Sequence, residues 1–328
     1  MLQRKIDNCA KSSGNLSLNT LFEGSKSVKS TAASSKTSSA PPRMFSDRAV
    51  NIFFQEWAPL FPVLHRPNFL KQYEDYVTKP EAVTDKHKLA QLHLVFSIAG
   101  LSSPLPDNEH VQSCDQQWQQ TIEAVSADNT LVALQTLVLA IICCISKADY
   151  KMLLHHMSNA VALCYRLGLH KSHIHDKADS VHVEIKKKVF WTLYTLDCFS
   201  AVMLGVPKLL KEADIQCERP NDIDNECLLK KGPKDKAYSD DSKMSSALHL
   251  FDLARIIAKI LAEVYPAAVM HILSAQRISN LERQLNEWHD ALGPQHKLTF
   301  AQDKPSTNLT GSRSAFLVST SSGRCGQY

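Results

Sequence analysis

Hydrophobic residues recur at helical spacing along most of this chain. Val50, Phe53, Phe54 and Trp57 fall at i, i+3, i+4 and i+7, which places them on one face of an α-helix. Similar stripes follow at intervals as far as Leu292. We find no convincing alternation typical of strands and no repeat of fixed period. The pattern therefore predicts an all-α fold of about eight to ten helices.

Capping and helix-ending residues divide these stripes into separate elements. Ser46, Asn129 and Asp149 are predicted to cap the helices that follow them, and Pro67 is predicted to open another. The predicted helices lie between Ser46 and Pro59, from Pro67 through Val77, over Thr84–Leu101, around Trp118, from Leu131 through Ile145, from Asp149 to Gly168, and over Val181–Leu204, Ser245–Tyr265 and Ser274–Leu292.

The helical part is bounded by two polar segments. Residues 1–43 carry ten serines between Ser12 and Ser39, and such a segment buries too little apolar surface to fold. We expect a disordered, Ser-rich, basic linker over 1–43, a helical domain over 44–300 and an irregular tail over 301–328. The polar tail leads us to expect a truncated C-terminal end.

Composition supports a globular intracellular protein. Of the 328 residues, 44% are hydrophobic and 21% charged, which is typical of a globular domain. The nine cysteines show no C-x2-C spacing, so neither a disulfide scaffold nor a zinc motif is indicated. The longest apolar run, Leu131–Ile145, is too short to span a membrane, and we expect no membrane association.

The basic surplus lies in the first segment. The net charge is +4, and residues 1–43 hold seven basic and two acidic residues. The helical part therefore has no net excess to attract phosphates. We expect this chain to bind DNA weakly, through the arm and without sequence preference. The run Lys186–Lys188 is predicted to lie on a solvated helix face.

Histidines offer one candidate for chemistry. Four histidines lie within 13 residues, and such a group is one possible metal site. They are His170, His173, His175 and His182. They lack the helical pairs or mixed clusters of zinc sites, so a solvated connector is favoured. His155 and His156 are helical neighbours, which we expect to point apart.

The other candidates also favour structural roles. Cys143 and Cys144 lie in the most apolar helix, where a thiol is expected to be buried and inert. Asp197 interrupts an apolar helix and is expected to find a cation or backbone N–H groups instead of acting in catalysis. Core packing is favoured over base stacking for the aromatic set Phe53, Phe54, Trp57, Phe61, Phe69 and Tyr73. We therefore predict no catalytic, cofactor-binding or metal-binding residue.

Several motifs in order resemble one family. They are Asn51–Trp57 with Phe61–Phe69, Ala162–His170, Lys188–Trp191 running through Tyr194–Asp197 to Leu204–Pro207 and Asp214–Ile215, Pro220–Asp224, and Gln302–Thr307. Together they resemble the helical middle-homology (xylanolytic-activator-type) regulatory domain of fungal Zn2Cys6 transcription factors. Any one motif is weak, but their order and spacing over residues 45–310 form a joint signal.

The resemblance implies a nuclear gene regulator. In that family an N-terminal six-cysteine zinc cluster reads DNA, and Cys9 alone does not supply one here, so no cofactor is expected in this chain. Implied partners are DNA through that missing cluster, a small-molecule effector, and the transcription machinery or a second copy. We expect an effector to be apolar and to bind between helices.

The chain also departs from the family pattern. Cys198 and Val206 stand where the family usually has basic residues, which leaves the partner of Asp197 open. The family continues with further helices beyond Leu317. A non-catalytic helical scaffold or a non-functional gene fragment remains an alternative, and a helical small-ligand binder or enzyme is a weaker one.

Overall fold

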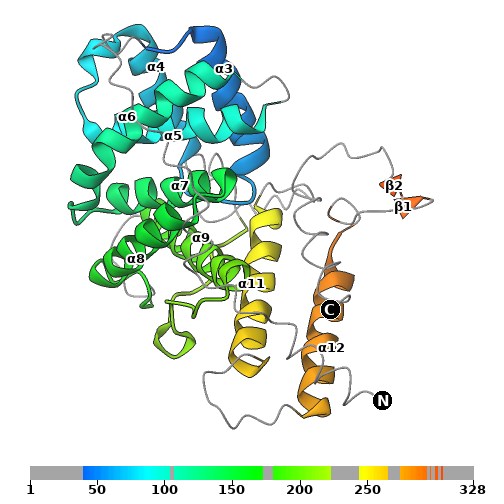
Figure 1. Ribbon diagram of the computed structural model, residues 1–328. Helices are drawn as coiled ribbons and strands as arrows, with labels where there is room; N and C mark the ends of the chain where they lie inside the picture. The colour runs from blue at the N-terminus through cyan, green and yellow to red at the C-terminus, as the bar shows by residue number, and fades with distance from the viewer. Residues whose placement is uncertain are drawn as a thin grey trace.

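The structure is a computed structural model that describes residues 40–103, 107–172, 180–222, 244–264, 274–293, 296, 300–301 and 304–305. Within these residues the fold is helical, as the sequence predicts (Figure 1). Most of the predicted linker and of the predicted tail lie outside the described residues.

The first helices form one end of the molecule, at the top of Figure 1. Helix α5 lies at the centre of this group and packs against its neighbours α3 and α6. The elements are α3 (Arg43–Ile52), which continues into a π-helical turn (Phe53–Trp57), α4 (Arg66–Thr78), a 3₁₀ turn (Pro80–Ala82), α5 (Lys86–Ser102) and α6 (Asn108–Ser126).

The remaining helices extend this group on one side. Helix α7 packs against α5, α6, α8 and α9, and α11 lies between α9 and α12 (Figure 1). Their bounds are Leu131–Lys147 for α7, Tyr150–Arg166 for α8, Ser180–Leu204 for α9, Ser245–Val264 for α11 and Ala275–Ala291 for α12. A short 3₁₀ turn, Glu212–Asp214, follows α9.

Helix α7 forms the centre of the core. Every residue from Ala133 to Cys144 is buried. A helix that is apolar on all sides must be surrounded by other helices, and α7 has four such neighbours. A second, smaller apolar cluster around Leu253 and Trp288 joins α12 to α11.

One predicted cap is confirmed and two are wrong. Asp149 accepts a hydrogen bond from the Met152 backbone N–H at 3.1 Å, as expected for the cap of α8. Thr130, not Asn129, caps α7 by accepting from the Ala133 N–H. Ser46 is not a cap, because α3 begins earlier, after Pro42.

Three of the described residues adopt left-handed backbone conformations at helix ends. Gly168 (φ 69°) and Gly205 (φ 64°) follow α8 and α9, where the absence of a Cβ removes the steric cost. Ala148 (φ 54°) takes the same conformation after α7, although it carries a Cβ.

Two short strands are an addition to the predicted all-α architecture. β1 (Phe300–Ala301) pairs antiparallel with β2 (Lys304–Pro305). Strands of two residues bury no apolar face of their own, so the fold class stays helical. Among the described helices, none combines the length and apolar character needed to cross a bilayer.

Candidate functional site

The segment Gly205–Asp222, which we call the strap, folds back along α9. Polar side chains of α9 hold it at intervals of three or four residues, which is the spacing of one helix face. The contacts involve Glu184, Lys187, Trp191, Tyr194 and Asp197. They run in the reverse order along the strap, so the two segments are antiparallel.

Asp197 anchors the beginning of the strap. Its carboxylate is only 2% exposed and accepts hydrogen bonds from the backbone N–H of Leu209, at 3.0 and 3.1 Å, and of Leu210, at 2.8 Å. Burial raises the pKa of Asp197, while these N–H groups and the nearby Lys208 ammonium offset part of that rise. The expectation that Asp197 finds backbone N–H groups is confirmed.

Tyr194 holds the next part of the strap. Its hydroxyl donates to the carboxylate of Glu212. The Lys208 ammonium lies 4.0 Å from the centre of the Tyr194 ring and 3.0 Å from Glu212 Oε1. One cation therefore contacts both the aromatic face and the carboxylate, and burial raises the pKa of the Tyr194 hydroxyl.

Trp191 links the strap to α11. Its indole Nε1–H donates to the Glu218 carbonyl at 2.9 Å. The ring lies 6.2 Å from that of Phe251, and the Arg255 guanidinium lies 5.8 Å from its centre. The strap also pairs with α11 directly through Arg219 and Asp252.

Glu184 closes the far end of the strap. Its two carboxylate oxygens accept from the Asn221 backbone N–H at 2.8 Å and from the Asn221 side-chain amide at 2.9 Å. Lys187 lies 3.4 Å from Glu184 and 3.9 Å from Glu218. Charged side chains of α9 and of the strap therefore fix the C-terminal end of the strap on the helix.

The prediction of a solvated face for Lys186–Lys188 is wrong. Lys188 is only 2% exposed, and the other two lysines are half-buried. Lys187 lies beside the strap, where it pairs with Glu184 and Glu218. A charge run alone does not show which of its members the rest of the fold will bury.

The predicted burial of the cysteines is confirmed. Cys143 and Cys144 are buried in α7, and burial raises the pKa of Cys143 to about 12. A thiol with so high a pKa stays protonated at neutral pH and is a poor nucleophile. Burial likewise raises the pKa of Cys198, beside Asp197, to about 12.

The histidines do not form a metal site in the described part of the chain. No group of three metal-ligating side chains occurs there. His173 and His175 lie outside the described residues, while His170 packs its ring 4.8 Å from that of Tyr165.

The expectation that His155 and His156 point apart is wrong in one respect. Their ring centres lie 5.4 Å apart in an edge-on contact, although His155 is exposed and His156 is buried. The two side chains therefore differ in solvent exposure, although their rings remain in contact.

The aromatic prediction is confirmed. Trp57 is half-buried and donates its indole N–H to Ser102 Oγ at 2.9 Å, while the other members of the set are buried in the core. Their rings contact one another, as in the 5.5 Å pair of Phe54 and Phe69. Packed rings of this kind offer no free face for a base.

Sequence reasoning missed the polar stripe of α9. The sequence analysis places Trp191 and Tyr194 in a family motif and does not single out Glu184, yet all three hold the strap together with Asp197. The signal was present in part, since these residues fall at helical spacing from Asp197. The described arrangement is a set of polar contacts that fixes a loop on a helix.

A protein-family model matches most of the chain. The model described as "Fungal specific transcription factor domain" matches residues 50–290, which include α9 and the strap. No solved structure matches the chain.

Curated relatives agree with this match. The chain is 53% identical to Transcriptional activator protein acu-15 of Neurospora crassa, over 85% of this chain and 30% of that protein. It is 24% identical to Activator of stress genes 1 of Saccharomyces cerevisiae, over 77% of this chain and 28% of that protein. Regulatory protein CAT8 of Saccharomyces cerevisiae is 21% identical, over 74% and 20% respectively. The chain thus spans less than a third of the length of these relatives.

Proposed function

The chain belongs to the fungal specific transcription factor domain family, which confirms the resemblance carried by its motifs, and we propose that it is the regulatory body of a larger transcription factor. The observation that supports this most strongly is the family match over residues 50–290, a range that contains the described helices from α4 to α11. The proposal includes action in the nucleus, where transcription takes place.

The chain works by conformation and carries no catalysis of its own. In support, the described cysteine thiols are buried and the one deeply buried carboxylate of α9, Asp197, is occupied by backbone N–H groups. Regulation then rests on an equilibrium between two arrangements of the helical body, which a small effector, a second copy or the transcription machinery shifts by binding one of them better. DNA is read by a zinc cluster elsewhere in the parent protein.

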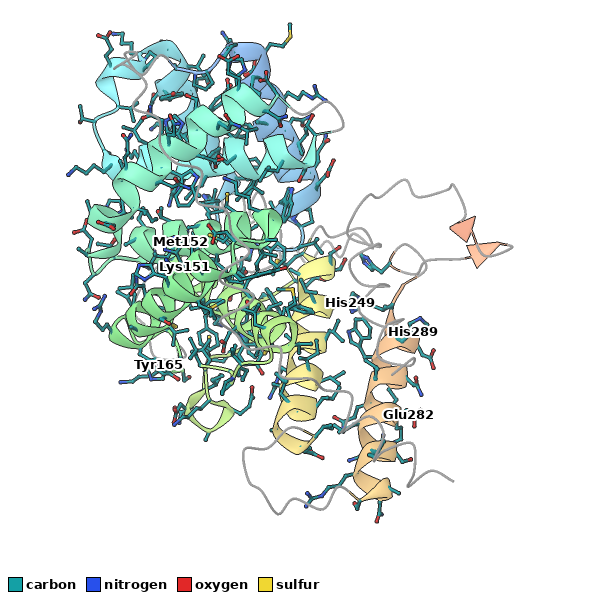
Figure 2. All side chains as sticks on the ribbon, in the orientation of Figure 1. Lys151, Met152, Tyr165, His249, Glu282 and His289 are labelled. Atoms are coloured by element: carbon teal, nitrogen blue, oxygen red, sulfur yellow. The ribbon has the colours of Figure 1, made fainter. Side chains whose placement is uncertain are left out.

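A tethering experiment tests the regulatory role. The chain is placed between an unrelated DNA-binding domain and a strong activation domain, and a reporter gene is measured across growth conditions. We expect reporter output to depend on the growth condition only when the chain is present. Asp197→Ala, which loosens the strap, should change that dependence, whereas Lys151→Gln on the exposed side of α8 should not (Figure 2). Output identical with and without the chain in every condition would contradict the proposal.

DNA binding by the chain alone provides a second test. The basic arm should bind DNA weakly, without sequence preference, and release it as salt rises from 50 to 200 mM, since a few lysine–phosphate contacts are lost by screening. Fluorescence anisotropy with and without residues 1–39 measures this. Nanomolar, sequence-specific binding in the presence of competitor DNA would refute the proposal that another part of the parent protein recognises the DNA sequence.

A further inference from the structure

Helix α12 is attached to the rest of the described fold mainly through α11. The contact is a small apolar cluster, in which Leu253 and Ile256 of α11 meet Trp288 and Leu292 at the end of α12. The beginning of α12 is exposed, and Ile278 there is 47% exposed. An element with few buried contacts separates from a fold at a lower free energy than a core helix does. We therefore expect α12 to leave the fold more readily than the buried α7.

Two histidines join the same two helices. His249 lies on α11 and is half-buried, while His296 follows α12 and is 9% exposed. The centres of their rings lie 5.3 Å apart, with the ring planes at 64°. His296 Nε2 lies 3.3 Å from Ser245 Oγ at the start of α11. The Trp288 indole N–H donates to the backbone carbonyl of His249 at 2.9 Å, so the histidine pair lies next to the apolar cluster.

The surroundings of the pair favour neutral imidazoles. Burial lowers the pKa of both His249 and His296 below the ordinary value of 6.5. The neighbouring His296 and the Arg219 guanidinium of the strap lower the pKa of His249 further, and the Asp222 carboxylate offsets part of that change. Arg219 is itself paired with Asp252 of α11, so its charge stays close to that helix. A proton on either imidazole is therefore less favourable in the closed arrangement than in water.

The charged groups of α12 at this end do not compensate for such a proton. His289 and Asp290 follow Trp288 on α12, and both are exposed. The Nδ1 atom of His289 lies 3.5 Å from the Asp290 carboxylate, so these two groups pair with each other. Figure 2 shows His289 near the end of α12 and His249 on the neighbouring α11.

We propose that His249 and His296 form a pH-sensitive latch, which keeps α12 on α11 while both imidazoles are neutral and releases it when they take up protons. Two positive charges 5.3 Å apart repel each other in the closed form, whereas water solvates them after release. Because the pKa of each histidine is lower in the closed form than the value of about 6.5 in water, the closed form is favoured above pH 6.5 and is lost as the pH falls below it. Release uncovers Trp288 and the apolar face of α11. The proposal does not depend on the role in transcription, because release is measured directly.

The indole N–H of Trp288 reports on the latch, since it donates to the His249 carbonyl. The full chain is labelled with ¹⁵N-tryptophan, and the Trp288 NMR signal, identified by its loss in Trp288→Phe, is followed from pH 7.5 to pH 5.5. We expect a second Trp288 signal from the released form. The ratio of released to closed α12 should rise about tenfold for each histidine that binds its proton only after release. Trp57, whose indole N–H donates to Ser102 Oγ on α5, monitors the rest of the helical body and should not change.

Histidine variants test whether this pair is responsible. His249→Gln combined with His296→Gln should leave the Trp288 signal unchanged over the whole range, and each single variant should leave only about a tenfold rise. His289→Gln is the matched control, because His289 is an exposed histidine on α12, and it should leave the transition unchanged (Figure 2).

Three outcomes would overturn the latch. They are a constant Trp288 signal in the unmodified chain, an unaltered pH response when either histidine is replaced, and loss of the Trp57 signal together with that of Trp288, which would indicate global unfolding. None of them would affect the family assignment.

Discussion

Substitution of Asp197 by alanine tests whether the strap depends on this single carboxylate. The variant leaves the N–H groups of Leu209 and Leu210 without their acceptor, and Leu210 is fully buried. Hydrogen bonds to a charged group contribute about 1.5–3 kcal/mol each, and a buried donor left unsatisfied costs a comparable amount. Burial nevertheless raises the pKa of Asp197, so alanine also relieves a desolvation cost. The net loss should be about 1–3 kcal/mol in the free energy of unfolding.

Urea unfolding followed by circular dichroism at 222 nm measures this loss. Hydrogen exchange of the Leu209 and Leu210 amides locates it, since both amides should exchange faster in Asp197→Ala. Asp214→Ala is the matched control, because Asp214 is an exposed acid on the same strap, and it should change stability by less than about 0.5 kcal/mol. An Asp197→Ala variant with unchanged stability and unchanged amide exchange would refute the role of Asp197 as the anchor of the strap.

Three further predictions concern the helical body. Burial lowers the pKa of His93 and His156 from 6.5 to about 4, so these imidazoles stay neutral in the folded state down to lower pH than in the unfolded state. The free energy of unfolding should therefore be insensitive to these groups above pH 7 and fall by up to about 3 kcal/mol per histidine as pH drops from 6.5 to 4. His156→Leu should flatten that decline in urea titrations, and an identical decline in the variant would contradict the assignment. A Cβ on Gly100 would collide with the Val111 side chain where α5 meets α6, so Gly100→Ala should cost about 1–3 kcal/mol and addition of Val111→Ala should restore most of it. Ala148→Gly should raise stability by about 1 kcal/mol, because Ala148 holds a left-handed conformation that glycine adopts without strain; a lower melting temperature would disprove this.

Local patterns in the sequence predicted the helices well because helix ends depend on short-range chemistry. Asp149 caps α8, and glycine ends α9, both within a few residues of the predicted position. One of the two wrong caps also has a local physical reason. Asn129 and Thr130 are adjacent residues with similar capping ability, and the backbone of α7 uses the second.

Ser46 shows where tertiary contacts override a local signal. Its hydroxyl forms a 2.8 Å hydrogen bond with the Tyr73 hydroxyl, which lies on α4. Tyr73 in turn donates to Asp47 at 2.6 Å. Ser46 therefore links α3 to α4 instead of capping a helix. The local sequence around a serine does not distinguish these two roles.

The strap could be predicted only in part. The sequence identified Asp197 as a costly buried carboxylate and required a partner for it, but the family pattern directed attention to the absent basic residues at Cys198 and Val206. The actual donors are backbone N–H groups, which every residue carries except proline, so their identity depends on the path of the chain.

We propose that this helical body regulates transcription within a longer protein of its family. The most direct test replaces the matching region of the Neurospora crassa activator acu-15, which is 53% identical, with residues 40–305 of this chain and measures transcription of a gene that acu-15 activates. We expect the chimaera to activate transcription and to respond to growth conditions as the parent activator does. The same chimaera carrying Asp197→Ala should lose that response. A chimaera that is expressed and folded but gives no regulated transcription under any condition would contradict the proposed regulatory role.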